Sequence, residues 1–141
     1  MAVSKGNRFR LGFIINPFAG LGGSVALKGS DDMAATALAL GAVPMASQRA
    51  EYALQELLAL RDQLVIVTVA GAMGADLAEK LGFTLEVLKW TPAEPSTATD
   101  SEEAAAQLSQ LGIDLLLFAG GDGTARNICN SVKPSTTVLG I

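Results

Sequence analysis

Short strand-like segments, most of them apolar, alternate along this chain with segments of helical periodicity. The strand candidates are residues 11–15, 64–69, 84–89, 113–118 and 136–141, and the helix candidates are residues 33–40, 47–61, 75–81, 102–111 and 125–132. Strands that are apolar throughout are typical of sheets covered on both faces. The alternation therefore predicts a three-layer α/β/α fold with a mostly parallel sheet. With 141 residues, we expect residues 1–141 to form a single domain.

The charge of the chain restricts its partners. The formal net charge is −4 and the sequence pI is about 4.7, so the chain has no general attraction for nucleic acid or for an anionic membrane surface. The longest uncharged stretch, residues 33–48, is short and interrupted by Gly41 and Pro44, which argues against a membrane span. Small anions remain possible ligands, because backbone N–H groups at helix starts bind them locally.

The absence of histidine and the single cysteine, Cys129, exclude several kinds of chemistry. Ser-His-Asp and Cys-His mechanisms both need a histidine, and a zinc site is improbable without one, so we expect no metal-binding residues. A lone cysteine forms no internal disulfide, which favours a reducing, cytoplasmic location. Any acid–base chemistry therefore falls to Asp, Glu or Lys.

Ligands of doubly wound sheets bind outside the carboxyl ends of the strands. Three loops are expected to meet at that edge, namely residues 16–31, 91–101 and 120–124. The last of these, Gly-Gly-Asp-Gly-Thr, follows a strand and precedes a helix. Its glycines would let a phosphate approach the backbone, and the helix start would favour an anion. Asp122 could then accept a proton from, or orient, a hydroxyl that attacks phosphorus.

A purely structural interpretation of the same five residues is a tight turn. In that case Asp122 forms an Asx-turn, and Thr124 is the N-cap of a helix that begins near Ala125. The position of the whole string after a buried strand favours the functional interpretation.

The string at residues 120–124 matches the GGDGT signature shared by NAD kinases, diacylglycerol kinases, sphingosine kinases and some bacterial relatives of 6-phosphofructokinase. Other segments resemble one group, the ATP-NAD kinase-like proteins that include the acetoin-catabolism protein X. Residues 15–23 resemble its INPxAGxGG stretch, residues 27–31 its LKGTD element and residues 97–101 its TxxDT loop; residues 125–126 and 138–141 are also similar. The resemblance extends from about Leu11 to Ile141.

This resemblance implies an α/β domain that is normally followed by an all-β domain, with a nucleotide between the two. It implies a kinase that uses ATP or polyphosphate with Mg²⁺, and NAD as ligand or substrate in NADP biosynthesis. Asp122 would be the catalytic base that faces the ribose hydroxyl. The implied nucleotide-binding residues are Asn16, Gly20, Gly22, Gly23, Lys28, Thr97, Asp100, Gly120, Gly121, Gly123, Thr124 and Arg126.

The resemblance also implies an incomplete site. The Asn-Glu pair that NAD kinases use would lie beyond Ile141, and an apolar strand at the end of the chain suggests truncation, so the chain alone is expected to be inactive. An open sheet edge there could also produce a homo-oligomer. The group often has Asp where this chain has Asn127, and Gly where it has Asp32.

Several alternatives stay open at this point. Lys28 could be a surface lysine, Arg126 could pair with an acid, and Asp100 or Ser101 could cap the helix expected at residues 102–111. The protein as a whole could be a non-catalytic nucleotide sensor rather than an enzyme. A lipid kinase ranks third, because lipid kinases usually lack the element seen at residues 27–31.

Overall fold

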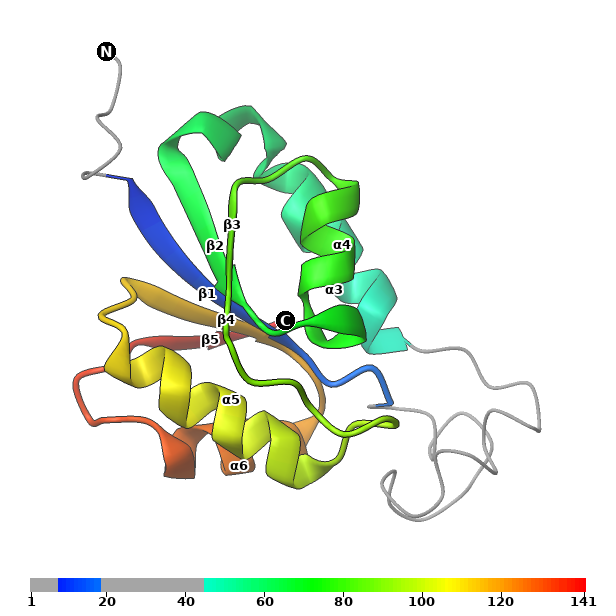
Figure 1. Ribbon diagram of the computed structural model, residues 1–141, viewed down its shortest axis with the longest axis vertical. Coiled ribbons are helices and arrows are strands. Elements are labelled where there is room, and N and C mark those ends of the chain that lie inside the picture. The colour runs from blue at the N-terminus through cyan, green and yellow to red at the C-terminus, as the bar shows by residue number, and fades with distance from the viewer. Residues whose placement is uncertain (1–7, 19–44) are drawn as a thin grey trace.

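The structure, a computed structural model, describes residues 8–18 and 45–141 (Figure 1). Within them, five strands form one parallel sheet. The strands are β1 (Phe9–Ile15), β2 (Leu64–Thr68), β3 (Leu85–Val87), β4 (Leu115–Ala119) and β5 (Val138–Gly140). The helices are α3 (Met45–Glu56), α4 (Ala75–Lys80), α5 (Ala98–Gln110) and α6 (Asp122–Ser131), with 3₁₀ turns η2 (Leu58–Gln63) and η3 (Gly71–Met73). The helix predicted at residues 33–40 lies outside the described residues.

The strand order determines where a ligand can bind. The order across the sheet is β3-β2-β1-β4-β5, so the chain first moves outward from β1 through β2 to β3. It then crosses back to place β4 on the other side of β1, with Leu11 opposite both Ile66 and Leu115. The topology therefore reverses between β1 and β4, and the region beyond the carboxyl ends of these two strands is the expected ligand position.

Helices cover both faces of the sheet, as the alternation of elements predicts (Figure 1). Phe13 of β1 belongs to the core on one face, where Ala50 and Leu54 of α3 and Ala78 of α4 are buried. Ile14, the next residue, belongs to the core on the other face, with α5 and α6. Adjacent residues of a strand point to opposite faces, so one apolar run supplies both cores. The predicted three-layer architecture is confirmed.

Three predicted helix boundaries were wrong by more than two residues. The helix expected at residues 102–111 begins at Ala98, and its N-cap is Thr97 rather than Asp100 or Ser101. The last helix begins at Asp122 rather than near Ala125, with Gly121 as N-cap, so Thr124 lies inside the helix. The long helix expected to end near Arg61 instead stops at Glu56 and gives way to η2.

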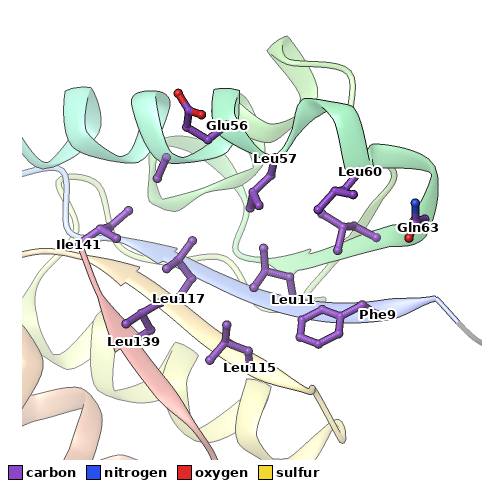
Figure 2. Close-up of a pocket in the computed structure, with 12 residues that line it drawn as sticks. Phe9, Leu11, Glu56, Leu57, Leu60, Gln63, Leu115, Leu117, Leu139 and Ile141 are labelled. Atoms are coloured by element: carbon purple, nitrogen blue, oxygen red, sulfur yellow. The ribbon is translucent and has the colours of Figure 1, made fainter.

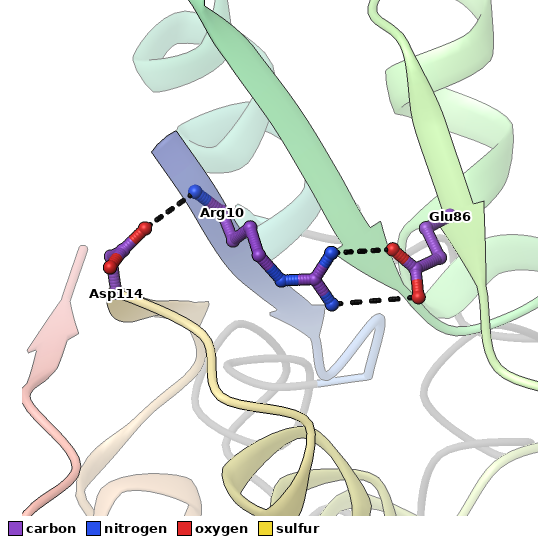
Figure 3. A network of polar contacts seen from close by, with 3 residues as sticks. All are labelled: Arg10, Glu86 and Asp114. Atoms are coloured by element: carbon purple, nitrogen blue, oxygen red, sulfur yellow. Dashed lines mark hydrogen bonds and ion pairs between the residues drawn. The ribbon is translucent and has the colours of Figure 1, made fainter. Parts of the chain in front are cut away.

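A polar network ties together strands on the side of the sheet opposite the ligand edge (Figure 3). The Arg10 guanidinium forms an ion pair with Glu86 of β3, with 2.8 Å between Nη1 and Oε2. The backbone N–H of Arg10 donates to Oδ2 of Asp114, just before β4, at 2.8 Å. Both charged partners are partly exposed, so the pair contributes on the order of 0.2–1 kcal/mol, and we assign it a structural role.

Candidate functional site

The loop after β1 is joined to the turn after β4 at the point where the topology reverses. The Asn16 backbone N–H donates to the carbonyl of Ala119 at 2.9 Å, which continues the β1–β4 pairing by one residue. The side-chain Nδ2 of Asn16 then donates to Oγ1 of Thr124 at 3.0 Å. Its Oδ1 accepts the N–H of Phe18 at 3.2 Å. One asparagine therefore sets the path of its own loop and holds the first turn of α6.

The turn after β4 presents free backbone donors. The first bond within α6 runs from the Ala125 N–H to the Gly121 carbonyl at 3.0 Å. The N–H groups of Asp122, Gly123 and Thr124 precede it and have no partner inside the helix. No side chain in the described part of the chain caps this end. These donors lie at the positive end of the helix dipole, an arrangement that suits a phosphate group.

Two glycines of the turn have different structural explanations. A Cβ on Gly120 would lie 2.6 Å from three side-chain atoms of Thr124, so tight packing explains this glycine. A Cβ on Gly123 would meet no described atom within 4 Å, and its φ lies outside the left-handed region. Packing among the described residues therefore gives no reason for glycine at residue 123. Close approach of a ligand to the backbone does give one.

Asp122 occupies the first position of α6 and is exposed. Its carboxylate forms no hydrogen bond or ion pair with another described residue. A carboxylate beside unpaired N–H groups is free to meet a hydroxyl of a bound molecule. This placement is compatible with the predicted role of Asp122, which stays a prediction.

The two predicted residues on the third loop form a capping box. Asp100 is buried, and its carboxylate accepts the N–H of Thr97 at 2.8 Å, the Thr97 hydroxyl at 3.1 Å and the N–H of Ala93 at 3.2 Å. These bonds fix the loop before α5 and account for Asp100 without a ligand. Nucleotide contact by Thr97 and Asp100 stays a prediction, and the structure gives it no added support.

Of the remaining predicted residues, some lie on α6 and the others fall outside the described residues. Arg126 is exposed on α6, one turn beyond Asp122. Asn127, where the resembling group often has Asp, is partly buried on the same helix. Gly20, Gly22, Gly23 and Lys28 lie outside the described residues.

The structure adds a fourth loop to the ligand edge, which the sequence prediction did not include. Residues 71–74 follow β2 and contain η3. Gly74 is buried, and a Cβ there would collide with the hydroxyl of Thr68. That hydroxyl donates to the carbonyl of Phe13 at 2.7 Å. The signal was present in the sequence, because Gly71 and Gly74 lie shortly after an apolar strand.

Arg49 is a second residue that the prediction missed. It lies on α3, and its guanidinium reaches the carboxyl edge of the sheet. Nη2 donates to the carbonyl of Gly120 at 3.2 Å, and Nε donates to the carbonyl of Ile141 at 3.4 Å. Periodicity marks Arg49 only as an exposed helix position, so the sequence alone carried no signal of this contact.

The described residues fit a metal ion that arrives with a nucleotide better than one held by the protein alone. No group of three or more His, Cys, Asp or Glu is positioned to hold a metal ion in the described ranges. Mg²⁺ in kinase sites is commonly bound by one or two carboxylates together with substrate phosphates. The turn after β4 offers one acidic side chain, Asp122, whose predicted role is that of the base, so a bound ion would be held mainly by the phosphates of the nucleotide.

A sizeable cavity lies away from this edge. An apolar groove of about 670 Å³ runs over the sheet face beside α3 and η2, mostly toward the amino ends of β1 and β4 (Figure 2). Ten of its lining residues carry no polar side-chain atom, and Glu56 and Gln63 supply the polar ones. A nucleotide phosphate needs several convergent donors, which this groove does not offer. We therefore place the candidate site at the β1–β4 edge and not at the groove.

Within residues 8–18 and 45–141, the helices are too short or too polar to cross a lipid bilayer.

Comparisons with known proteins identify the family of the chain. No curated protein and no solved structure matches the chain. One family model does, that of the ATP-NAD kinase N-terminal domain, and it matches residues 11–141. The match includes the loop after β1, the turn after β2 and the Gly-Gly-Asp-Gly-Thr turn after β4. The chain therefore belongs to the ATP-NAD kinase N-terminal domain family.

Proposed function

We propose that this chain binds a nucleotide at the β1–β4 edge, as part of a phosphotransferase that acts on a ribose hydroxyl of NAD or of a related acceptor. ATP, or alternatively polyphosphate, would be the phosphoryl donor. The observation that carries the proposal is the Asn16–Thr124 hydrogen bond, which joins two family-matched loops where the topology reverses. It holds the loop after β1 against the turn that carries the free N–H groups of α6 and the Asp122 carboxylate.

Each part of the turn has a chemical role in the proposal. The N–H groups of Asp122, Gly123 and Thr124 would bind phosphate oxygens. Bound Mg²⁺ would neutralise charge on the donor phosphates. Arg126 and, on the loops outside the described residues, Lys28 and the glycines of residues 20–23 would add further contacts. Phosphoryl transfer depends largely on positioning and charge stabilisation, which such a set of donors supplies.

Asp122 has the role of base. The acceptor oxygen forms a bond to the transferred phosphorus, and the bond from phosphorus to the leaving oxygen of the donor breaks. The proton of the acceptor hydroxyl passes to the Asp122 carboxylate and from there to solvent. Its exposed position and its lack of ion pairing with the described residues leave the carboxylate available for this step.

The test measures turnover and binding separately. The longest natural polypeptide that contains these residues is incubated with ATP, MgCl₂ and NAD, and NADP is quantified, with polyphosphate as a second donor. Asp122→Asn is assayed beside Asn130→Asp, a control that alters an exposed position elsewhere on α6. We expect Asp122→Asn to lose at least about 100-fold in kcat, with ATP and NAD affinity kept. Unchanged turnover in Asp122→Asn would remove the base assignment.

A second candidate, a nucleotide-binding sensor without turnover, is favoured by one feature. Residue 127, one turn beyond Gly123 on α6, is an asparagine and not a second carboxylate. In this case ATP or NAD raises the melting temperature of the wild-type protein, and neither donor yields a phosphorylated product with any acceptor tried. Phosphorylation of a lipid alcohol in place of NAD would instead assign the protein to the lipid kinases.

Two cellular properties belong to the same proposal. The free thiol of Cys129 is exposed, which suits the reducing cytoplasm. Strand β5 is the last strand of the described sheet, and its open edge could pair with a second copy to form a homo-oligomer. Size-exclusion chromatography with light scattering tests the second property.

A further inference from the structure

Arg49, on α3, contacts the backbone of the turn that carries the proposed nucleotide site. Its side chain leaves α3 and bonds two backbone carbonyls, Gly120 after β4 and Ile141 after β5. The Ile141 N–H in turn donates to the carbonyl of Phe118 at 2.9 Å. One planar guanidinium thus connects the carboxyl ends of two adjacent strands to a helix. A lysine ammonium lacks the fixed planar set of N–H donors of a guanidinium, so it could bond the same two carbonyls only poorly.

The Gly120 carbonyl that Arg49 bonds belongs to a peptide unit that no flanking side chain restrains. The peptide bond between Gly120 and Gly121 has glycine on both sides, so rotation of its plane meets little steric resistance. The bond is trans, which makes its C=O and N–H point in opposite directions. With the carbonyl turned toward Arg49, the N–H of Gly121 points away from it. That N–H has no backbone acceptor among the described residues.

The orientation of this peptide decides what a ligand would meet. In the observed orientation, the Gly121 N–H points away from Arg49 and directly precedes the N–H groups of Asp122, Gly123 and Thr124 in the chain, so it is available as a further donor at the start of α6. With the plane reversed, the Gly120 carbonyl oxygen would take its place. A carbonyl oxygen repels a phosphate, whereas an N–H attracts it.

We infer that Arg49 is a positioning residue of the nucleotide site, which keeps the Gly120–Gly121 peptide in the orientation that donates to a phosphate. This inference rests on the proposed function. Arg49 acts through the backbone of the turn, and it is not assigned a direct contact with the ligand. Its Nη1 group has no hydrogen-bond partner among the described residues, so the guanidinium also leaves positive charge beside the turn.

The test compares phosphate-bearing and phosphate-free ligands. Arg49→Ala and Arg49→Lys are titrated with ATP, with inorganic pyrophosphate and with adenosine by calorimetry. Arg61→Ala, which removes an exposed arginine of η2, is the matched control. We expect the Kd for ATP and pyrophosphate to rise about tenfold in both Arg49 variants, the loss of about one hydrogen bond to a charged group. The Kd for adenosine and the urea midpoint should stay close to wild type.

Two further measurements separate positioning from general support of the fold. The Gly121 amide resonance should shift in Arg49→Ala and not in Arg61→Ala, and millimolar methylguanidinium should restore pyrophosphate binding to Arg49→Ala. Equal loss of ATP and adenosine binding together with a lower urea midpoint would overturn the inference, since Arg49 would then only stabilise the fold. Wild-type ATP affinity in Arg49→Ala would overturn it while leaving the proposed function intact. A wild-type chain that binds none of the three ligands would overturn both.

Discussion

The substitution Gly120→Ala tests the packing that shapes the proposed site. The added Cβ would lie 2.6 Å from Cβ, Cγ2 and Oγ1 of Thr124, whereas carbon atoms in contact are normally about 3.5–4.0 Å apart. Thr124 must therefore move by roughly 1 Å, which strains α6 against β4. The shift also lengthens the hydrogen bond from Asn16 to Thr124. Overpacking and the weakened bond together should lower the free energy of unfolding by about 2–4 kcal/mol.

A neighbouring glycine provides the control. Gly123→Ala places a Cβ where no described atom lies within 4 Å, in the first turn of a helix. Alanine is favoured over glycine inside helices by about 0.5–1 kcal/mol. This variant should therefore be as stable as the wild type or slightly more so. Its affinity for ATP should nevertheless fall, because the new methyl group occupies the space assigned to the phosphate.

Urea unfolding followed by circular dichroism measures both variants, with the slope m checked for constancy. A Gly120→Ala protein within about 0.5 kcal/mol of wild type, the range of ordinary surface changes, would refute the packing argument. A Gly123→Ala protein that binds ATP with unchanged affinity would show that no ligand approaches this part of the backbone.

Three further substitutions have defined outcomes. Thr124→Val removes the acceptor of the Asn16 side chain and should lower the free energy of unfolding by about 1–3 kcal/mol; a double-mutant cycle with Asn16→Ala should show that the two losses are not additive. Asp100→Ala should cost about 1–3 kcal/mol, because three donors of the loop before α5 lose their acceptor, and unchanged thermal stability would contradict the capping role. Glu86→Gln should lower the free energy of unfolding by at most about 1 kcal/mol, and the difference should shrink in 1 M NaCl because salt screens the ion pair with Arg10. A larger loss in urea unfolding that does not depend on salt would contradict the assignment of Arg10 and Glu86 as a weak surface ion pair.

The sequence predicted the architecture because the central strands β1, β2 and β4 are largely apolar, whereas the short edge strand β3 contains Glu86. Leu11 to Ile15 supplies side chains to both cores, and such a run can be buried only between two layers of helices. The order of the strands could not be predicted in the same way. It depends on which helices pack over which strands, and a single sequence carries no local signal for that.

The errors at helix starts have a common physical cause. Thr97 and Asp100 form a capping box, in which the acidic residue lies three positions after the true N-cap. Taking the acid itself as the cap therefore displaced the start of α5. In α6, the Gly-Asp-Gly sequence has low helix propensity and suggested a turn, but the fixed end of β4 and the Asn16 bond hold it in the first helical turn.

The candidate site was only partly predictable. The turn at residues 120–124 was evident from its glycines and its position after a strand. Arg49 was not, because its partners are backbone carbonyls 71 and 92 residues away in sequence. Contacts of this kind depend on tertiary structure and leave no trace in residue spacing.

The most direct test of the central claim is chemical-shift mapping of the ¹⁵N-labelled chain with ATP and with NAD. The account predicts the largest changes at the amides of Gly121, Asp122, Gly123 and Thr124 and at the side-chain amide of Asn16. Changes confined to the apolar groove beside Leu60 and Leu139, or no change with either nucleotide, would contradict the assignment of the site to the carboxyl ends of β1 and β4.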